Sequence, residues 1–170
     1  VTFSPDLRFC ASGDARGRCM LWEVATGKLL HRLEGHTRRI SALTFLADGK
    51  TLLTASGDNT VGNWDLKTGK ENREQILKHP DAILSMAVFA DGKQAVTSCA
   101  DGLVRIWDLT KPEVVQTIKP ANGLINSVSI SHDNKRLLTA NVQQRVIQVW
   151  SVDTGKELLV PGKNGKLNPF

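Results

Sequence analysis

The sequence predicts an all-β protein made of four consecutive units, each a four-stranded antiparallel sheet. The main observation is a repeated tryptophan, because the four tryptophans of the chain are spaced 42, 43 and 43 residues apart. A second observation is that every tryptophan lies between two turn motifs at nearly constant distances. Internal periods of this length are the signature of repeat architectures. The four tryptophans are Trp22, Trp64, Trp107 and Trp150.

The two turn motifs divide each unit into strands. In the second unit, Ala47-Asp48-Gly49-Lys50 precedes the tryptophan and Thr68-Gly69-Lys70 follows it. Asp-Gly favours a tight hairpin because both residues tolerate the positive φ angles that such turns need. The strands predicted for this unit are residues 40–45, 51–55, 61–64 and 70–77. The fourth is polar over residues 71–75, which is typical of an outer edge strand that discourages unwanted sheet pairing.

A four-stranded sheet of this kind cannot bury both of its faces alone, so the units are expected to stack face to face. Along the predicted first strands, large side chains recur at two positions and small ones lie between them. This alternation favours a radial arrangement of blades, with the large residues of one sheet against the small residues of the next. The large residues are Val1, Leu43, Met86 and Val128 at one position and Phe3, Phe45, Val88 and Ile130 at the other.

Two short motifs carry a resemblance to a known family. Trp64-Asp65 and Trp107-Asp108 match the dipeptide that names the WD40 repeat, and Gly35-His36 matches its other hallmark. The sequence therefore resembles the WD40-repeat β-propeller family over essentially its whole length of 170 residues. The resemblance implies a single propeller segment, residues 1–170, with blades at about 1–35, 36–78, 79–121 and 122–165.

The resemblance also implies a hydrogen-bonded set of four side chains in each complete repeat. In the second unit this set would be His36, Ser56, Asp58 and Trp64. In the third unit it would be His79, Cys99, Asp101 and Trp107, where a thiol, a weaker donor, replaces the hydroxyl. Buried polar groups are stable only when they are hydrogen-bonded, so the set is expected to tie the strands of a blade together. The first and fourth units lack the full set and are expected to be degenerate.

WD40-like rings mostly use seven or eight blades, so four blades are expected to form an open arc of about half a ring. An arc leaves the outer faces of its end blades exposed, and apolar patches of that kind drive association. The ring would be completed by missing sequence or by a second copy of the chain, and the start at Val1 without Met favours missing sequence slightly. The residues expected on the two faces, or their neighbours, are Phe3, Phe9 and Leu21 on the first blade and Val128, Leu138 and Val149 on the last.

Residues that look catalytic are better explained by the repeat. His36, Asp58 and Ser56 suggest a hydrolase triad, but their spacing is that of the implied structural set. The Gly-Lys turns lack the glycine five residues upstream that a phosphate-binding loop requires. No pair among the four histidines and three cysteines has the short spacing typical of zinc ligands. No enzymatic activity, cofactor or metal is therefore expected.

The surface loops remain as candidates for function. In WD40-like propellers, the loops between second and third strands and between consecutive blades share one rim around the axial opening. Arg38 and Arg39 beside Asn59 would suit a carboxylate or a phosphate, because guanidinium groups bind both in a bidentate manner. The resemblance thus implies a non-catalytic scaffold that binds a peptide or protein. The candidate partner-binding residues are Arg16, Arg38, Arg39, Asn59, Asp81 and Arg145.

Two alternative functions remain open. A propeller enzyme would have its site at the axial channel, yet the predicted first strands offer small and hydroxyl-bearing side chains rather than acid–base groups. A nucleic-acid-binding propeller would suit the net charge of +5, but that charge is spread along the chain and no interleaved aromatic residues accompany it. Nucleic acid is therefore not the expected partner.

Cysteine usage and hydropathy indicate the compartment. Cys10, Cys19 and Cys99 form no C-x-x-C pair, and an odd number argues against a disulfide framework. Free thiols point to a reducing compartment, so a cytoplasmic location is expected. No stretch is apolar for long enough to form a transmembrane helix, so no membrane association is expected.

Overall fold

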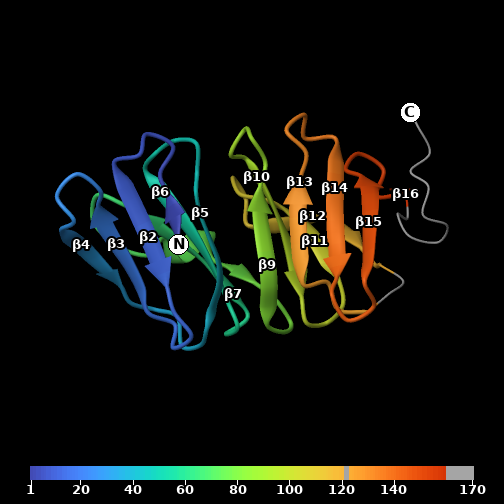
Figure 1. Cartoon of the computed structure of the whole chain (residues 1–170), viewed down its shortest axis with the longest axis horizontal. Helices are drawn as coiled ribbons and strands as arrows, with labels where there is room; N and C mark the ends of the chain where they lie inside the picture. Colours follow the sequence, from blue (N-terminus) through green and yellow to red (C-terminus); the bar gives the residue numbers. More distant parts are fainter. Residues whose placement is uncertain (121–122, 160–170) are drawn as a thin grey trace.

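The computed structural model describes residues 1–120 and 123–159, which form four four-stranded antiparallel sheets (Figure 1). We call these sheets the first to fourth blades, and in each the strands pair in chain order. The first two blades contain β1 (Thr2–Phe3), β2 (Phe9–Gly13), β3 (Cys19–Glu23) and β4 (Leu29–Leu33), then β5 (Ile40–Phe45), β6 (Thr51–Ser56), β7 (Thr60–Asp65) and β8 (Leu77–Lys78). The last two contain β9 (Ile83–Val88), β10 (Gln94–Cys99), β11 (Val104–Asp108) and β12 (Glu113–Ile118), then β13 (Ser127–Ile130), β14 (Arg136–Asn141), β15 (Val146–Ser151) and β16 (Glu157–Leu159). The predicted all-β architecture is therefore confirmed, and the four four-stranded blades make up part of a propeller. The predicted boundary at 121/122 and residues 160–165 lie outside the described residues.

The outer strand of the second blade differs from its prediction. A strand was expected over residues 70–77, but β8 covers only Leu77–Lys78 and a 3-10 turn occupies Arg73–Gln75. A single bridge between Trp64 and Glu71 is all that pairs the polar stretch with β7. The exposed polar residues of this stretch bury no apolar face, so nothing favours an extended strand there.

Each blade has two chemically different faces, because side chains alternate along a strand. We call the face that carries the tryptophan the indole face and the opposite one the aliphatic face. The indole face of the second blade, with Trp64, Leu52 and Phe45, packs on Leu21 and Ala11 of the first blade. In the same way, Trp107 of the third blade packs on the aliphatic face of the second.

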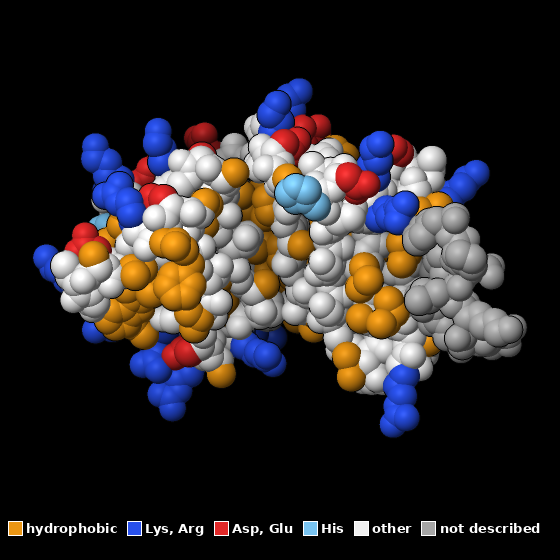
Figure 2. All heavy atoms as spheres, turned by 45° about the horizontal axis from the view of Figure 1, so that its top comes forward, with side chains coloured by type: hydrophobic (Ala, Val, Ile, Leu, Met, Phe, Trp, Pro, Cys, Tyr) orange, Lys and Arg blue, Asp and Glu red, His pale blue; other side chains and the backbone are white. Residues whose placement is uncertain are grey.

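The first and fourth blades each present one face that no other described sheet covers. Figure 2 shows hydrophobic side chains gathered over both ends of the row of blades, on one side of the molecule. On the first blade the uncovered face is the indole face, where Phe3 is exposed and Trp22 half-buried. On the fourth it is the aliphatic face, where Leu138 and Ile147 are exposed.

Three of the six residues named for these end faces lie elsewhere, but Cys10 and Trp22, the neighbours of Phe9 and Leu21, lie on the uncovered face of the first blade, as the prediction allowed. Phe9 and Leu21 point into the core between the first and second blades, because alternation along β2 and β3 places them opposite Trp22. Val128 is buried between the third and fourth blades. Phe3 and Leu138 are exposed as expected, and Val149 is half-buried.

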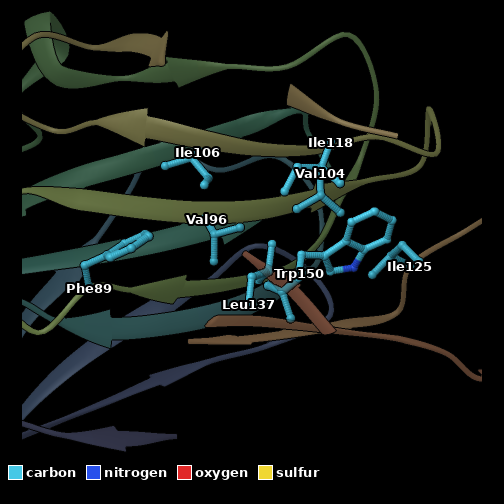
Figure 3. Packing of buried hydrophobic residues seen from close by; sticks show 9 residues of the cluster. Phe89, Val96, Val104, Ile106, Ile118, Ile125, Leu137 and Trp150 are labelled. Atoms are coloured by element: carbon cyan, nitrogen blue, oxygen red, sulfur yellow. The ribbon is translucent and has the colours of Figure 1, made fainter. Parts of the chain in front are cut away.

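The junction between the third and fourth blades shows what covers an aliphatic face inside the molecule (Figure 3). Val96 and Ile106 of the third blade meet Trp150 and Leu137 of the fourth. All four side chains are buried. The same pairing of an indole face with an aliphatic face therefore recurs at all three junctions between the described blades.

Candidate interaction rim and the network beneath it

A continuous hydrogen-bonded network crosses the second blade. Trp64 Nε1 donates to Thr54 Oγ1 at 2.7 Å, and Thr54 Oγ1 lies 2.7 Å from His36 Nε2. On its other side, His36 Nδ1 lies 2.8 Å from Asp58 Oδ2. Because the carboxylate can only accept, Nδ1 carries the proton and Nε2 accepts from the threonine hydroxyl. Every polar group in this chain of contacts is thereby satisfied.

Asp58 receives further donors at the end of this network. Thr60 Oγ1 donates to its Oδ1 at 2.6 Å and the Thr37 backbone N–H donates to its Oδ2 at 3.0 Å. Burial alone would raise the pKa of Asp58, but the hydrogen bonds from Thr60, Thr37 and His36 hold that pKa below its ordinary value. The carboxylate therefore fixes the turn between β6 and β7 against the loop that carries His36.

The structure corrects the predicted role of Ser56. Its hydroxyl does not bridge His36 and Trp64, which is the role of Thr54, two residues earlier on β6. Ser56 Oγ instead donates to the Arg38 carbonyl at 3.0 Å and accepts from the Asp58 N–H at 3.2 Å. Successive side chains on a strand face opposite ways, so Ser56 and Thr54 share a face but lie at different depths along it.

Sequence reasoning missed Thr54, although a signal was available. A hydroxyl residue lies ten residues before the tryptophan in the first three blades and eleven before it in the fourth. In each blade it accepts from the indole N–H, at 2.7–3.2 Å. The extra residue of the fourth blade lies in the β14–β15 turn. The four acceptors are Ser12, Thr54, Thr97 and Thr139.

The third blade has an altered version of the network. His79 Nε2 lies 2.8 Å from Thr97 Oγ1, but Asp101 pairs with Arg105 Nη2 at 2.6 Å instead of with the histidine. Among the described residues, His79 Nδ1 has no hydrogen-bond partner, nor does Arg105 Nη1. Burial and the nearby Arg105 guanidinium lower the pKa of His79 to about 4. Arg105 stands where the second blade has Gly62, two residues before the tryptophan.

Cys99 of the third blade matches Ser56 of the second in its contacts. Its Sγ donates to the Asp81 carbonyl at 3.2 Å, as Ser56 Oγ does to Arg38. Burial raises the pKa of the Cys99 thiol, which keeps it protonated and able to donate. The thiol of Cys99 therefore replaces the hydroxyl of Ser56 in the contact with the loop before the first strand. It does not take part in the hydrogen bond to the tryptophan, which Thr97 accepts.

Above these networks, the loops of the second and third blades are held together at one rim. Gly57 N–H donates to the Arg39 carbonyl at 2.8 Å, so both arginines belong to a segment fixed at its backbone. Asn59 accepts from the His79 N–H through its carbonyl at 2.8 Å, and its side chain lies 3.5 Å from the Pro80 carbonyl. Asp81 follows directly and is exposed. These contacts bring Arg38, Arg39, Asn59 and Asp81 onto one edge.

The other two candidate rim residues belong to the end blades. Arg16 is exposed on the β2–β3 turn, which approaches the second blade closely at Gly17. A Cβ at Gly17 would lie 2.7 Å from the carbonyl oxygens of both His36 and Arg38. Arg145 is exposed on the β14–β15 turn, and no hydrogen bond or ion pair between described residues joins it to the others. The rim residues therefore form one group on the first three blades, with Arg145 apart on the fourth.

A hollow of about 380 Å³ lies beside Arg39 and is lined by residues from the second, third and fourth blades. Ser41 and Asn126 contribute polar groups to its lining, and Ile83 and Leu84 contribute apolar ones. No acidic side chain lines it. In the described part of the chain, Arg38 and Arg39 make no side-chain hydrogen bond or ion pair, so their guanidinium groups are available to a ligand.

Within the described residues, no group of three or more His, Cys, Asp or Glu side chains could hold a metal ion. In the same part of the chain, no helix is long and apolar enough to cross a membrane.

Comparison with protein families gives matches to two segments. The model described as "WD domain, G-beta repeat" matches residues 27–65 and 71–108. Each segment begins with the outer strand region of one blade and ends with the third strand of the next. The repeat as the family defines it is therefore offset by one strand from the blade as the structure forms it.

Several curated proteins are similar to part of the chain. Periodic tryptophan protein 2 of Arabidopsis thaliana is 35% identical over 85 residues, which cover 50% of this chain and 9% of that protein. WD repeat and SOCS box-containing protein 1 of Homo sapiens is 38% identical over 84 residues, covering 49% of this chain and 20% of that protein. Protein groucho of Drosophila melanogaster is 34% identical over 71 residues, covering 42% and 10%. The matched segments thus span at most a fifth of these relatives.

Proposed function

We propose that this chain, which carries WD40 repeats, is a non-catalytic scaffold that binds an anionic side chain of a partner protein at the rim formed by Arg38 and Arg39. The similarity to WD-repeat proteins supports a protein-interaction scaffold in general. The identity of the bound group rests on the two arginines themselves. Both are exposed and unpaired within the described residues, and both belong to a backbone held by Ser56 and Gly57.

The loop that carries Arg38 and Arg39 suits an anion through its side chains and through its fixed backbone. A guanidinium group offers paired N–H donors that match the two oxygens of a carboxylate or a phosphate. The loop backbone is fixed by hydrogen bonds, so binding costs little backbone entropy. The lining of the adjacent hollow has no acidic side chain and includes apolar residues, against which a neighbouring side chain of the partner can be buried.

The non-catalytic part of the proposal rests on how the acid–base groups are used. His36 and Asp58 are hydrogen-bonded within the network that ends at Trp64, and both ring nitrogens of the histidine have a partner there. His79 is buried and its pKa is lowered to about 4, so it is neutral near pH 7 and has little access to a substrate. These groups support the blade and leave the rim for recognition.

We also propose a reducing compartment such as the cytoplasm. Cys10, Cys19 and Cys99 are all free thiols. Burial raises the pKa of Cys19 to about 12, which keeps that thiol protonated and unreactive. Assay of free thiols in the protein isolated from its own cells tests this, and a stable disulfide there would contradict it.

Peptide binding tests the rim directly. Fluorescence anisotropy with an array of acidic and phosphoserine-containing peptides should show binding that weakens as salt concentration rises. The variant Arg38→Ala/Arg39→Ala should weaken the best peptide at least tenfold, because it removes both guanidinium groups. A preference between glutamate and phosphoserine peptides would identify which anion the site takes.

The matched control removes the same charge from the opposite end of the blade. Lys50 and Lys67 are exposed on the hairpin turns at the other end of the second blade, so Lys50→Ala/Lys67→Ala should leave the affinity unchanged. Equal losses in both double variants would show that net charge, rather than the rim, attracts the peptides. Absence of binding to the whole array would contradict the anionic-site proposal.

A further inference from the structure

The hollow beside Arg39 contains a polar side chain that is not among the candidate rim residues. Asn126 lines this hollow from the segment before β13, on the fourth blade, and is exposed. Its backbone N–H donates to the Ala140 carbonyl at 2.9 Å, and its Oδ1 accepts from the Val142 N–H at 3.0 Å. Hydrogen bonds from both its backbone and its side chain therefore fix Asn126 against the end of β14.

The bond to Val142 determines which atom of the Asn126 amide is available to a ligand. Because Oδ1 accepts from a backbone N–H, the other end of the amide is Nδ2, which can only donate. Within residues 1–120 and 123–159, Nδ2 has no hydrogen-bond partner. The Arg39 guanidinium lines the same hollow from the second blade and is likewise unpaired in that part of the chain. Unused donors from two blades therefore line one hollow.

The Ser41 hydroxyl in this hollow has the opposite character. Ser41 Oγ donates its hydrogen to the Ala55 carbonyl at 3.2 Å, so only its lone pairs are available to a ligand. The apolar part of the lining includes Ala82 and Leu84 of the third blade, which are both half-buried. The hollow therefore offers donors on one side and an apolar surface beside them, which suits a small anionic group on an aliphatic stem.

We propose that Asn126 is a specificity-determining residue of the rim, where it and Arg39 together bind a glutamate or aspartate carboxylate of the partner protein in preference to a phosphorylated side chain. This inference rests on the proposed function and narrows its anion to one chemistry. A carboxylate has one charge and two oxygens, which a guanidinium group and an amide N–H can serve.

A phosphorylated side chain fits the same lining less well. It carries about −1.5 to −2 charges and three strongly accepting oxygens. Among the described residues that line the hollow, Arg39 alone is charged, and Ser41 has no hydrogen left to donate. The neighbouring Arg38 does not line the hollow. A phosphate bound there would therefore keep part of its charge and one of its oxygens without a partner.

The variant Asn126→Asp tests the role of the amide with almost no change of shape. Its carboxylate still accepts from the Val142 N–H, so the contact with β14 is kept while the free donor becomes a negatively charged acceptor. Fluorescence anisotropy with the glutamate peptide that binds the wild type most tightly should show a loss of about tenfold or more, because two carboxylates then face each other. The same peptide with glutamine in place of glutamate should bind Asn126→Asp at least as well as it binds the wild type.

A comparison on the wild type needs no variant. The glutamate peptide should bind more tightly than the same peptide with phosphoserine in place of glutamate. Tighter binding of the phosphoserine peptide would overturn the carboxylate preference and would leave the anionic rim standing.

Asn134→Asp is the matched control, because it adds the same charge on the turn at the other end of β13. Asn134 Oδ1 also accepts from a backbone N–H, that of Ala90 at 3.1 Å, and Asn134 does not line the hollow. This variant should leave the affinity for the glutamate peptide unchanged. Circular dichroism checks that both variants keep their β structure.

The failure of this inference differs from the failure of the proposed function. If Arg38→Ala/Arg39→Ala weakens the glutamate peptide and Asn126→Asp does not, Asn126 has no role in specificity and the anionic rim stands. Equal losses in Asn126→Asp and Asn134→Asp would show that net charge repels the peptide, which also overturns the inference. Absence of binding to every acidic and phosphoserine peptide would overturn both.

Discussion

At the scale of single residues, the hydroxyl of Thr54 joins two groups that would otherwise be unsatisfied inside the second blade. It accepts from the Trp64 indole and donates to His36, each at 2.7 Å. Trp64 is 1% exposed, so its N–H has no access to water when Thr54 is replaced. Loss of one hydroxyl therefore leaves both a donor and an acceptor without a partner.

The variant Thr54→Val measures this contribution with almost no change of shape. It should lower the free energy of unfolding by about 2–4 kcal/mol, because each stranded group costs roughly 1–3 kcal/mol. Denaturant titration gives the value. Thr44→Val on the adjacent strand is the control, since the Thr44 hydroxyl makes no hydrogen bond in the described part of the chain. Its effect should stay within about 0.5 kcal/mol, and equal losses at both positions would show that the bridge contributes nothing.

At the scale of an element, the second and third blades differ in how one carboxylate is used. In the second blade, Gly62 leaves space near the indole and Asp58 pairs with His36. In the third blade, Arg105 occupies the glycine position and pairs with Asp101, which leaves His79 with one bonded nitrogen. Burial lowers the pKa of this histidine, and the Arg105 guanidinium on β11 lowers it further.

This difference predicts a pH dependence of stability. The folded-state pKa of His79 is lowered from 6.5 to about 4, so between these values the unfolded chain binds the extra proton. Stability from this residue is therefore full above about pH 6.5 and is lost as the pH falls toward 4. Arg105→Gly frees Asp101 to accept a hydrogen bond from His79. It should therefore raise the pKa of His79 and make the free energy of unfolding change less with pH. NMR titration of the imidazole measures the pKa directly.

Arg18→Gly provides the matched control for that prediction. Arg18 forms the same type of pair with Asp14 in the first blade, at 2.6 Å, but is exposed and lies far from His79. Loss of this pair should leave the change of unfolding free energy between about pH 4 and 6.5 as it is in the wild type. A His79 pKa that does not move in Arg105→Gly would contradict a contribution of Arg105, beside that of burial, to the lowered pKa.

The elements of the blades could be predicted from sequence because they repeat. The tryptophan period and the two turns placed most strands correctly, as the second blade shows at residues 40–45. The short β8 could not be predicted, since an irregular polar edge carries no period. Thr54 was missed because the set implied by the resemblance placed the hydroxyl at the residue nearest the turn, which is Ser56. Thr54 lies on the same face of β6 and also carries a hydroxyl, so the sequence alone does not distinguish the two. The pairing of Asp101 with Arg105 could not be predicted, because spacing does not show which of Arg105 and His79 binds the carboxylate.

At the scale of the whole molecule, stability is expected to depend on the junctions between blades. Other described sheets cover both faces of the second and third blades but only one face of the first and of the fourth. In repeat proteins, stability is approximately a sum of the repeats and their nearest-neighbour contacts. The end blades should therefore open most easily in any form of the protein that leaves their outer faces uncovered.

Hydrogen exchange along these 170 residues tests most directly whether the junctions between blades determine stability. We expect slower exchange in β6 and β10, which lie in the two middle blades, than in β2 and β14, which lie in the end blades. Equal protection in all four blades would contradict this expectation.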